Sequence, residues 1–333
     1  MKDSNGEGIE NVLIQPDSGI APVTGLIGDA KSSIQIKQFT LDEPRIVDSL
    51  IAAHDRGVLV RVLLNPQRPS GLKSNEDIFR KFADHKIPVK WTSPKFAVTH
   101  EKSLLVDRAT ALISTFNMSL KYFTETRDFG VILKNPALVS EIGRCFDADW
   151  DEKDFIPDPA LPLIWSTTNS RKKIAGFIDR ARSTLDIQHP KLTDITVLDR
   201  LLDAQNRGVK IRFLCGGAHG IQQWDICDTF SSWHALARAG VTIHRMKHLK
   251  LHAKLLIADN KRVITGSMNL CRTAFDQRRE LGIEITRPDV VKTFAGIFNH
   301  DWEHSKHYMA PDPLAETPPN NGELPFDPGF LHD

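Results

Sequence analysis

Residues 99–107 read Thr-His-Glu-Lys-Ser-Leu-Leu-Val-Asp, and residues 251–259 read Leu-His-Ala-Lys-Leu-Leu-Ile-Ala-Asp. Both stretches spell the pattern His-x-Lys-x-x-x-x-Asp, and each is followed at matching distances by a hydroxyl residue, an asparagine and an acid. The matching set is His100, Lys102, Asp107, Thr115, Asn117 and Asp128 in the first copy, and His252, Lys254, Asp259, Ser267, Asn269 and Glu280 in the second. The acid follows the histidine by 28 residues in both copies. The chain therefore contains the same set of polar residues twice.

The duplication extends well beyond this motif, which indicates a repeated fold and not a short tandem array. Arg56-Gly57-Val58 reappears as Arg207-Gly208-Val209, and the segment ending at Trp150 reappears in the segment ending at Trp302. The repeat runs from about residue 20 to residue 150 and from about residue 172 to residue 302. We predict two domains, residues 1–156 and 157–309, followed by a Pro-rich tail over residues 310–333 that is extended or disordered.

Strand and helix signals alternate within each copy. Residues 33–36 and 184–187 show the period-two alternation of strands, and residues 58–64 and 209–214 read as buried strands. Between them, apolar residues share one helical face, and Gly57 and Gly208 stand where a helix C-terminal cap is expected. The pattern predicts an α/β class fold, built from two similar α/β/α sandwich repeats with helices on both faces of a parallel or mixed sheet.

The spacing within the motif has a physical purpose. The apolar residues after each lysine favour a strand, and residues two apart in a strand point to the same face. His100 and Lys102 should therefore project together, as should His252 and Lys254. If the next strand forms a hairpin with the first, Asn117 and Asn269 join the same patches. Because equivalent positions of two repeats can meet at one interface, we expect a single site with two histidines, two lysines and two amides.

Composition limits the partners of this site. The 333 residues include 43 Lys and Arg against 42 Asp and Glu, a formal net charge of +1, so any anion site must be local. The four cysteines form no Cys-x-x-Cys pair, and the motifs offer no plausible set of metal ligands. No stretch approaches the length of a transmembrane helix, and the polar start is unlike a signal peptide. We expect a cytoplasmic protein that needs neither a metal nor another cofactor.

The paired motifs resemble those of the phospholipase D superfamily, and the resemblance covers about residues 20–302. Within the superfamily, the sequence is most similar to bacterial soluble phospholipase D-like and cardiolipin-synthase-like proteins. It departs from the family pattern at Ser114-Thr115, where Gly-Ser is usual, and at Asp128, where Glu is commoner. The resemblance implies two α/β halves with the active site at their interface, and a phosphodiesterase or phosphatidyltransferase that works through a phosphohistidine.

The resemblance also implies a role for each residue of the motif. His100 is expected to be the nucleophile and His252 the general acid, following the usual order in the family. Lys102, Lys254, Asn117 and Asn269 would hold the phosphate oxygens, with Thr115 and Ser267 as further substrate-binding residues. Asp128 and Glu280 would accept a hydrogen bond from a histidine ring and fix its tautomer. Asp107 and Asp259 are expected to fix a turn and not to touch substrate.

The substrate is left open by the sequence. We favour a phospholipid, because one phosphate clamp with an apolar approach suffices for it, and Phe96, Ala97 and Val98 could supply that approach unless they are simply core residues. Tyr122, Phe123 and Trp224 are either substrate contacts or ordinary surface aromatics. The hypothesis includes peripheral contact with a membrane. The alternative substrate is nucleic acid, which would make the protein a metal-independent nuclease, and a third hypothesis is a phosphate-binding protein without activity.

Overall fold

The computed structural model describes residues 7–67, 75–219, 221 and 223–313; the side chains of residues 223 and 224 are not described. The elements of the first half are β1 Ile9–Gln15, α1 Ala21–Asp29, β2 Ser33–Gln38, α2 Pro44–Asp55, β3 Leu59–Leu64, α3 Glu76–Asp84, β4 Val89–Trp91, β5 Val98–Thr99, β6 Ser103–Val106, β7 Thr110–Ser114, α4 Leu120–Thr124, β8 Thr126–Leu133 and α5 Pro136–Trp150. Those of the second half are β9 Leu163–Trp165, α6 Ser170–Asp179, β10 Thr184–Gln188, α7 Ile195–Asn206, β11 Lys210–Cys215, α8 Gln223–Arg238, β12 Thr242–Met246, β13 Lys250–Leu251, β14 Leu255–Ala258, β15 Arg262–Gly266, α9 Arg272–Asp276, β16 Arg278–Arg279, β17 Leu281–Ile285, α10 Pro288–Glu303 and β18 Ser305–His307. The predicted tail lies outside the described residues beyond residue 313.

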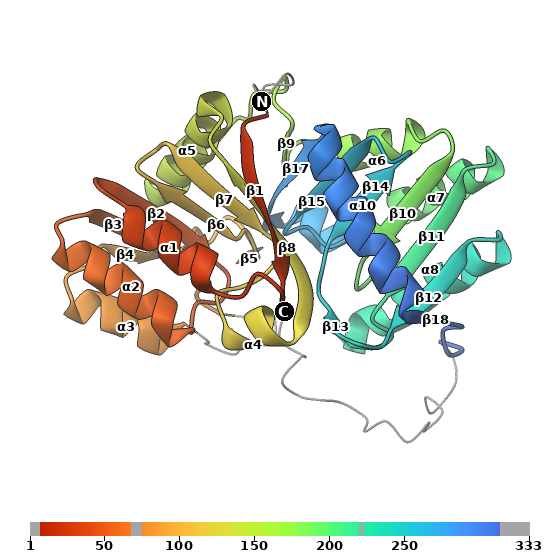
Figure 1. Cartoon of the computed structure of the whole chain (residues 1–333), viewed down its shortest axis with the longest axis horizontal. Coiled ribbons are helices and arrows are strands. Elements are labelled where there is room, and N and C mark those ends of the chain that lie inside the picture. Colours follow the sequence, from red (N-terminus) through yellow and green to blue (C-terminus); the bar gives the residue numbers. More distant parts are fainter. Residues whose placement is uncertain (1–6, 68–74, 220, 222, 314–333) are drawn as a thin grey trace.

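Two mixed sheets stand side by side, one in each half (Figure 1). The first has the strand order β1-β8-β7-β6-β2-β3-β4, and the second has the order β18-β12-β11-β10-β14-β15-β17-β9. In both, the strand that carries the end of the His/Lys motif pairs antiparallel with the next strand, as β6 does with β7 and β14 with β15. The predicted duplication of a mixed α/β fold is confirmed.

Local sequence explains where the equivalent helices begin and end. Pro44 opens α2 and the Glu43 side chain accepts a hydrogen bond from the backbone of Arg45. After the helix, Gly57 adopts a φ of 90°, and Gly208 adopts 88° after α7. These left-handed conformations are cheap for glycine, so each chain can turn at once into the next strand.

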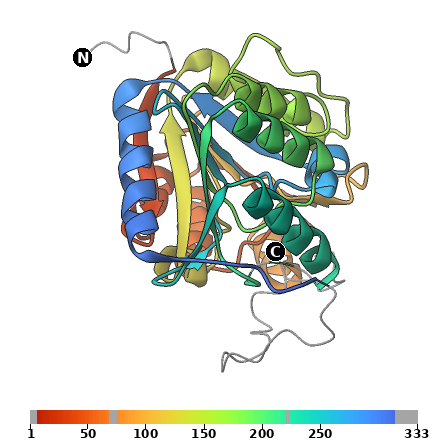
Figure 2. The same ribbon diagram turned by 90° about the vertical axis from the view of Figure 1, so that its right-hand side faces the viewer.

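Helices cover both faces of the second sheet, with α10 on one side and α6, α7 and α8 on the other (Figure 2). The core between α10 and the strands is shared by the two halves. It joins Phe129 and Val131 of β8 to Leu281 and Ile283 of β17, and Phe129 meets Phe294 of α10 with ring centroids 5.2 Å apart. Burial of this common core fixes one half against the other.

Candidate active site

Two short strands cross between the halves and place the motif histidines. β5, which precedes His100, pairs with β16 of the second half, whereas β13, which precedes His252, pairs with β8 of the first half. The amides of His100 and Glu101 both donate to the carbonyl of Arg279, at 2.9 Å. The amides of His252 and Ala253 donate to the carbonyl of Arg127, at 3.3 and 2.9 Å. Each histidine is thus held by the opposite half.

This exchange corrects one detail of the sequence prediction. His100 and Lys102 do not lie within a strand, because β6 begins only at Ser103, and in the second half β14 begins only at Leu255. His100 and Lys102 lie in the link between β5, which pairs with the second half, and β6 of the first sheet. His252 and Lys254 lie in the equivalent link between β13, which pairs with the first half, and β14 of the second sheet. The prediction that histidine and lysine converge still holds: the charge of Lys102 contributes to lowering the pKa of both histidines.

The two acids contact the histidines in a crossed arrangement. Nδ1 of His100 lies 2.9 Å from Oε2 of Glu280, and Nδ1 of His252 lies 2.7 Å from Oδ1 of Asp128. All four side chains are buried, with His252 the most exposed at 5%. Burial is the largest cause that lowers the pKa of both histidines, and the neighbouring lysines add to it. The rings are therefore neutral near pH 7, as a nucleophile requires.

The two acids have unequal surroundings. Asp128 accepts hydrogen bonds from the hydroxyls of Thr115 and Thr126, at 2.5 and 2.6 Å, as well as contacting His252. Oε1 of Glu280 is buried and has no hydrogen-bond partner among the described residues. Although burial opposes it, the His252 ring and these donors hold the pKa of Asp128 below its usual value. Burial raises the pKa of Glu280 to about 7. Asp128 is thus the more firmly ionised acid.

Both motif lysines are buried beside their own histidines. Nζ of Lys102 donates to the carbonyl of His100 at 2.7 Å, and Nζ of Lys254 donates to that of His252 at the same distance. Lys254 also lies 2.8 Å from Nε2 of His252. Nε2 of His100 is buried and has no hydrogen-bond partner in the described part of the chain. Nε2 of His100 is therefore open to a ligand, whereas Nε2 of His252 contacts the Lys254 ammonium.

The asparagines lie in equivalent turns. Asn117 follows β7 and Asn269 follows β15, and both are buried. The residue after each forms an isolated bridge, Met118 with Leu41 and Leu270 with Leu192, so both turns are fixed to their own half.

The motif hydroxyls already have hydrogen-bond partners within the protein. Thr115 is committed to Asp128 and accepts from the amide of Phe129 at 2.8 Å. The hydroxyl of Ser267 accepts from the amide of Leu281 at 3.0 Å. A hydroxyl already held by a carboxylate or by a neighbouring strand is poorly placed to bind substrate. Thr115 and Ser267 therefore support the acids and their strands from behind.

Asp107 and Asp259 fix turns, as the sequence predicts. Oδ1 of Asp107 accepts from the amides of Ser32 and Ser33, at 2.7 and 2.9 Å, and Asp259 does the same with Ser183 and Thr184. Although partial burial opposes it, these donors lower the pKa of both carboxyls to about 2. Each aspartate thereby ties the motif strand to the start of the adjacent strand, β2 or β10.

Arginines at the interface were missed by the sequence analysis. Arg127 of the first half binds Asp301 of the second, Nε to Oδ2 at 2.9 Å, and Arg279 of the second binds Asp149 of the first, Nη2 to Oδ1 at 2.8 Å. A signal existed, because an arginine precedes the motif acid in both copies. Each of these ion pairs joins one half to the other, as the two histidine–acid pairs do.

Arg278 has no such counterpart, since Thr126 occupies the equivalent position of the first half. Its side chain is buried, and no carboxylate of the described residues pairs with its guanidinium. Its charge contributes to lowering the pKa of both His100 and Glu280. It is therefore a further cation of the site, on the His100 side.

Aromatic rings cover the histidines. The ring of Tyr122 lies 4.8 Å from that of His252, and Phe39 lies 5.0 Å from His100. Tyr122 and Phe123 are buried, so they are not surface aromatics as one reading of the sequence had it. The side chain of Trp224 lies outside the described residues. These aromatic rings therefore pack directly against both histidines.

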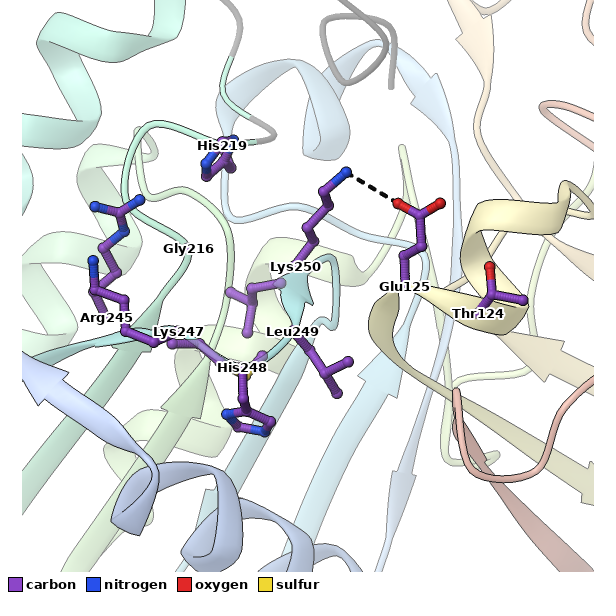
Figure 3. A pocket seen from close by; sticks show the side chains of 11 residues that line it. Thr124, Glu125, Gly216, His219, Arg245, Lys247, His248, Leu249 and Lys250 are labelled. Atoms are coloured by element: carbon purple, nitrogen blue, oxygen red, sulfur yellow. Dashed lines mark hydrogen bonds and ion pairs between the residues drawn. The ribbon is translucent and has the colours of Figure 1, made fainter. Parts of the chain in front are cut away.

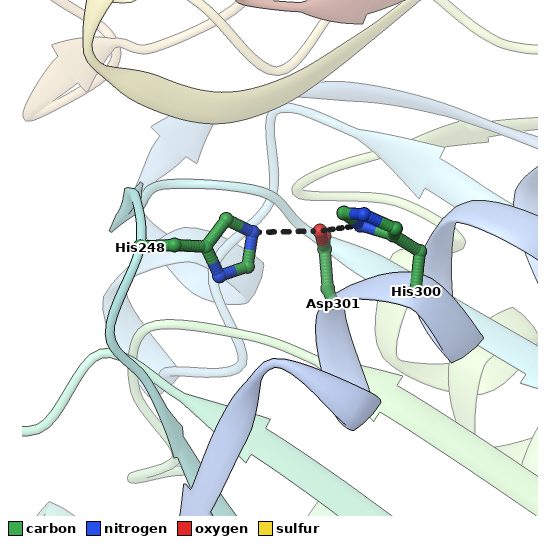
Figure 4. A group of neighbouring side chains, drawn as sticks. All are labelled: His248, His300 and Asp301. Atoms are coloured by element: carbon green, nitrogen blue, oxygen red, sulfur yellow. Dashed lines mark hydrogen bonds and ion pairs between the residues drawn. The ribbon is translucent and has the colours of Figure 1, made fainter.

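Within the described part of the chain, two clusters have ligand types that could hold a metal. Glu101, Cys145 and Asp149 surround Nζ of Lys37, which lies 2.9 Å from Glu101 and 2.6 Å from Asp149, so an ammonium already neutralises this group. In the other cluster, His248 and His300 flank Asp301 (Figure 4). Both oxygens of Asp301 already accept from Arg127. Neither cluster includes a motif histidine, so neither is suited to bind a catalytic metal.

The duplicated fold and the crossed histidine pairs define a two-repeat protein of the phospholipase D superfamily. The chain belongs to the family described as "Cardiolipin synthase, PLD-like domain", whose model matches residues 23–150 and 174–302. None of its described helices is long and apolar enough to cross a bilayer.

Relatives with names include a phospholipase D of Rickettsia felis, which is 32% identical over 124 residues, 37% of this chain and 59% of the relative. A phospholipase D Z of Dictyostelium discoideum is 26% identical over 212 residues, 61% of this chain and half of the relative. The chain thus spans less than two thirds of the length of these relatives. Among solved structures, phosphatidylserine synthase of Haemophilus influenzae has a TM-score of 0.70 at 14% identity and covers 92% of this chain and 88% of its own. That likeness concerns the fold.

Proposed function

We propose that the protein cleaves or exchanges the phosphodiester of a phospholipid through a phosphohistidine. The observation that carries the proposal is the crossed pairing of His100 with Glu280 and His252 with Asp128, beside two buried lysines. One histidine acts through Nε2 as a nucleophile and the other as an acid. Phospholipid is favoured because several relatives bear the names phospholipase D, cardiolipin hydrolase and cardiolipin synthase.

The reaction needs two displacements at phosphorus. In the first, Nε2 of the nucleophile forms a bond to phosphorus while the bond to the leaving alkoxide breaks, and the other histidine gives the alkoxide a proton. In the second, that histidine takes a proton from water or an alcohol, whose oxygen displaces the ring nitrogen. Such proton transfer is worth typically ~10²–10⁴-fold. Lys102, Lys254 and Arg278 stabilise the charge that develops on the phosphate oxygens.

The unequal acids favour one assignment of the two roles. Asp128 accepts from two hydroxyls, so it stays ionised and accepts a hydrogen bond from Nδ1–H of His252, which leaves a lone pair on Nε2. A protonated Glu280 instead donates to Nδ1 of His100 and leaves a proton on Nε2. When Nε2 gives that proton to the leaving alkoxide, Nδ1 takes the Glu280 proton, so the His100 ring ends neutral and Glu280 ends ionised. These contacts favour His252 as nucleophile and His100 as acid. The order in the family implies the reverse, and a direct experiment decides between them.

Trapping the intermediate tests both the mechanism and the order. The wild type, His100→Ala and His252→Ala would be mixed with a ³²P-labelled phospholipid and quenched in alkali, in which phosphohistidine survives. We expect label on His252 in the wild type and in His100→Ala, with none in His252→Ala. Label on His100 would reverse the order. Turnover of phospholipid by wild type without label at any pH would contradict the covalent mechanism.

A further inference from the structure

A cationic cavity of about 450 Å³ lies where the two halves meet, outside the catalytic pair (Figure 3). Its lining comes from the end of α4, from the loop after β11 and from the segment that joins β12 to β13. The lining includes Glu125, Gly216, Arg245, Lys247, His248 and Lys250. Three of these side chains are lysine or arginine and one is an acid, so the lining is cationic overall.

Strand register connects this cavity to the catalytic pair. In the parallel pairing of β13 with β8, Lys250 lies opposite Thr126 and Leu251 lies opposite Arg127. His252 follows β13 directly, and Asp128 is the next residue of β8. The amides of Lys250 and His252 donate to the carbonyls of Glu125 and Arg127, at 3.1 and 3.3 Å. The cavity lining therefore adjoins the His252 side of the site.

The lining has features of a built site. Nζ of Lys250 lies 3.0 Å from Oε2 of Glu125, a contact that spans the two halves (Figure 3). Gly217 adopts a φ of 70°, and a Cβ at this position would lie 2.7 Å from Nε of Arg245. Only glycine therefore lets the Arg245 side chain lie against the loop after β11. The left-handed backbone of Gly217 thus leaves space for the Arg245 side chain.

The first half does not repeat this arrangement. Counting back from the two histidines, Lys95 matches Lys247, but Ser93 stands in place of Arg245, Phe96 in place of His248 and Val98 in place of Lys250. Val98 is buried, and Nζ of Lys95 lies 2.8 Å from Oδ1 of Asp154. The segment before His100 thus carries one lysine, whereas the segment before His252 carries an arginine and two lysines.

We propose that the cavity beside β13 binds a phosphate group other than the one attacked, carried by the headgroup of the substrate. The inference rests on the proposed function and names the class of phospholipid: one whose headgroup has a second phosphate within a few bonds of the scissile one. Arg245 supplies a planar pair of donors and the lysines supply point charges, which together suit a phosphate.

A binding experiment tests the cavity without requiring turnover. Calorimetry would compare glycerol 1,3-bisphosphate, glycerol 3-phosphate and inorganic phosphate on the wild type and on Arg245→Gln/Lys247→Gln. The matched control is Lys31→Gln/Lys261→Gln, which removes the same charge from exposed turns. We expect the bisphosphate to bind at least about tenfold more tightly than the monophosphate, and only the cavity variant to lose that advantage. The proposal is overturned if glycerol 1,3-bisphosphate binds no more tightly than glycerol 3-phosphate or inorganic phosphate. It is also overturned if Arg245→Gln/Lys247→Gln still binds the bisphosphate more tightly than the monophosphate.

A second arm measures kcat/KM on phosphatidylglycerol and on phosphatidylglycerol phosphate in the same mixed micelles. These lipids differ only in the terminal phosphate. The wild type should prefer the phosphorylated lipid, and the cavity variant should lose the preference while still cleaving phosphatidylglycerol. Parallel losses on both lipids would count against a second phosphate site. If neither lipid is cleaved, the proposed function fails, and the binding arm still decides what the cavity holds.

Discussion

Nδ1 of His252 lies 2.7 Å from Oδ1 of Asp128, although the histidine belongs to the second half and the aspartate to the first. The His100–Glu280 pair crosses in the opposite direction at 2.9 Å. A histidine in this site is therefore oriented by an acid that lies far away in the sequence. Neither half contains a complete pair, so activity depends on how the halves are docked.

The acids should respond unequally to neutral replacements. Asp128→Asn removes an ionised partner that two threonines stabilise, so we expect turnover of phospholipid to fall by about 10²-fold or more. Glu280→Gln replaces a carboxyl that is partly protonated near pH 7, and the loss should stay below about tenfold at pH 6. Initial rates on vesicles at pH 6 and pH 8 measure both. Equal losses in the two variants would contradict the asymmetry.

Stability should depend on pH through Glu280. Its pKa is about 7 when folded, above the usual 4.5, so the folded state holds a proton that the unfolded state has released between those values. The free energy of unfolding should therefore fall as pH rises from about 4.5 to 7 and then level off. The effect is on the order of 3 kcal/mol. Urea unfolding of the wild type and Glu280→Gln at pH 5 and pH 8 measures it. The variant should lack this part of the pH dependence.

Arg278 should contribute to phosphate binding near His100. Arg278→Gln removes a buried cation that no carboxylate of the described chain neutralises, so we expect kcat/KM to fall by about ten- to a hundredfold. Arg278→Lys should restore part of it. A purely structural role would instead lower the unfolding midpoint and leave kcat/KM of the folded enzyme unchanged. Measuring both quantities on the two variants separates these cases.

Activity should survive chelation, because the cations at the site are side chains and lysine is a poor metal ligand when charged. Turnover in excess EDTA should match that of the untreated protein. Activity that disappears in EDTA and returns with zinc or magnesium would exclude the mechanism. Metal analysis of the purified protein by mass spectrometry provides the control.

Phospholipid should be preferred to nucleic acid. Binding DNA draws most of its affinity from several phosphate contacts along an extended basic surface, whereas the net charge here is +1. Phosphatidylglycerol vesicles and single-stranded DNA would compete in one assay at two salt concentrations. Cleavage of DNA that weakens steeply with salt, while the lipid stays intact, would assign the protein to the nucleases.

Much of the site could be predicted because its residues recur at fixed spacing. Equal spacing between His100 and Asp128, and between His252 and Glu280, identified the acids without any structure. The crossing could not be predicted, since spacing within a copy contains no information about which copy supplies the partner. It depends on β5 and β13 joining the opposite halves, and two-residue strands have no periodicity to detect. Arg278 could not be found in this way, because the equivalent residue in the first copy is Thr126.

The exchange of β5 and β13 also makes assembly of the site depend on completion of the fold. Here a nascent chain that has completed only its first half has His100 but neither Glu280 nor the Arg279 carbonyl that anchors it. Unfolding of the second half removes the same contacts of His100. Both histidine–acid pairs therefore form only in the complete fold and are lost when the two halves separate.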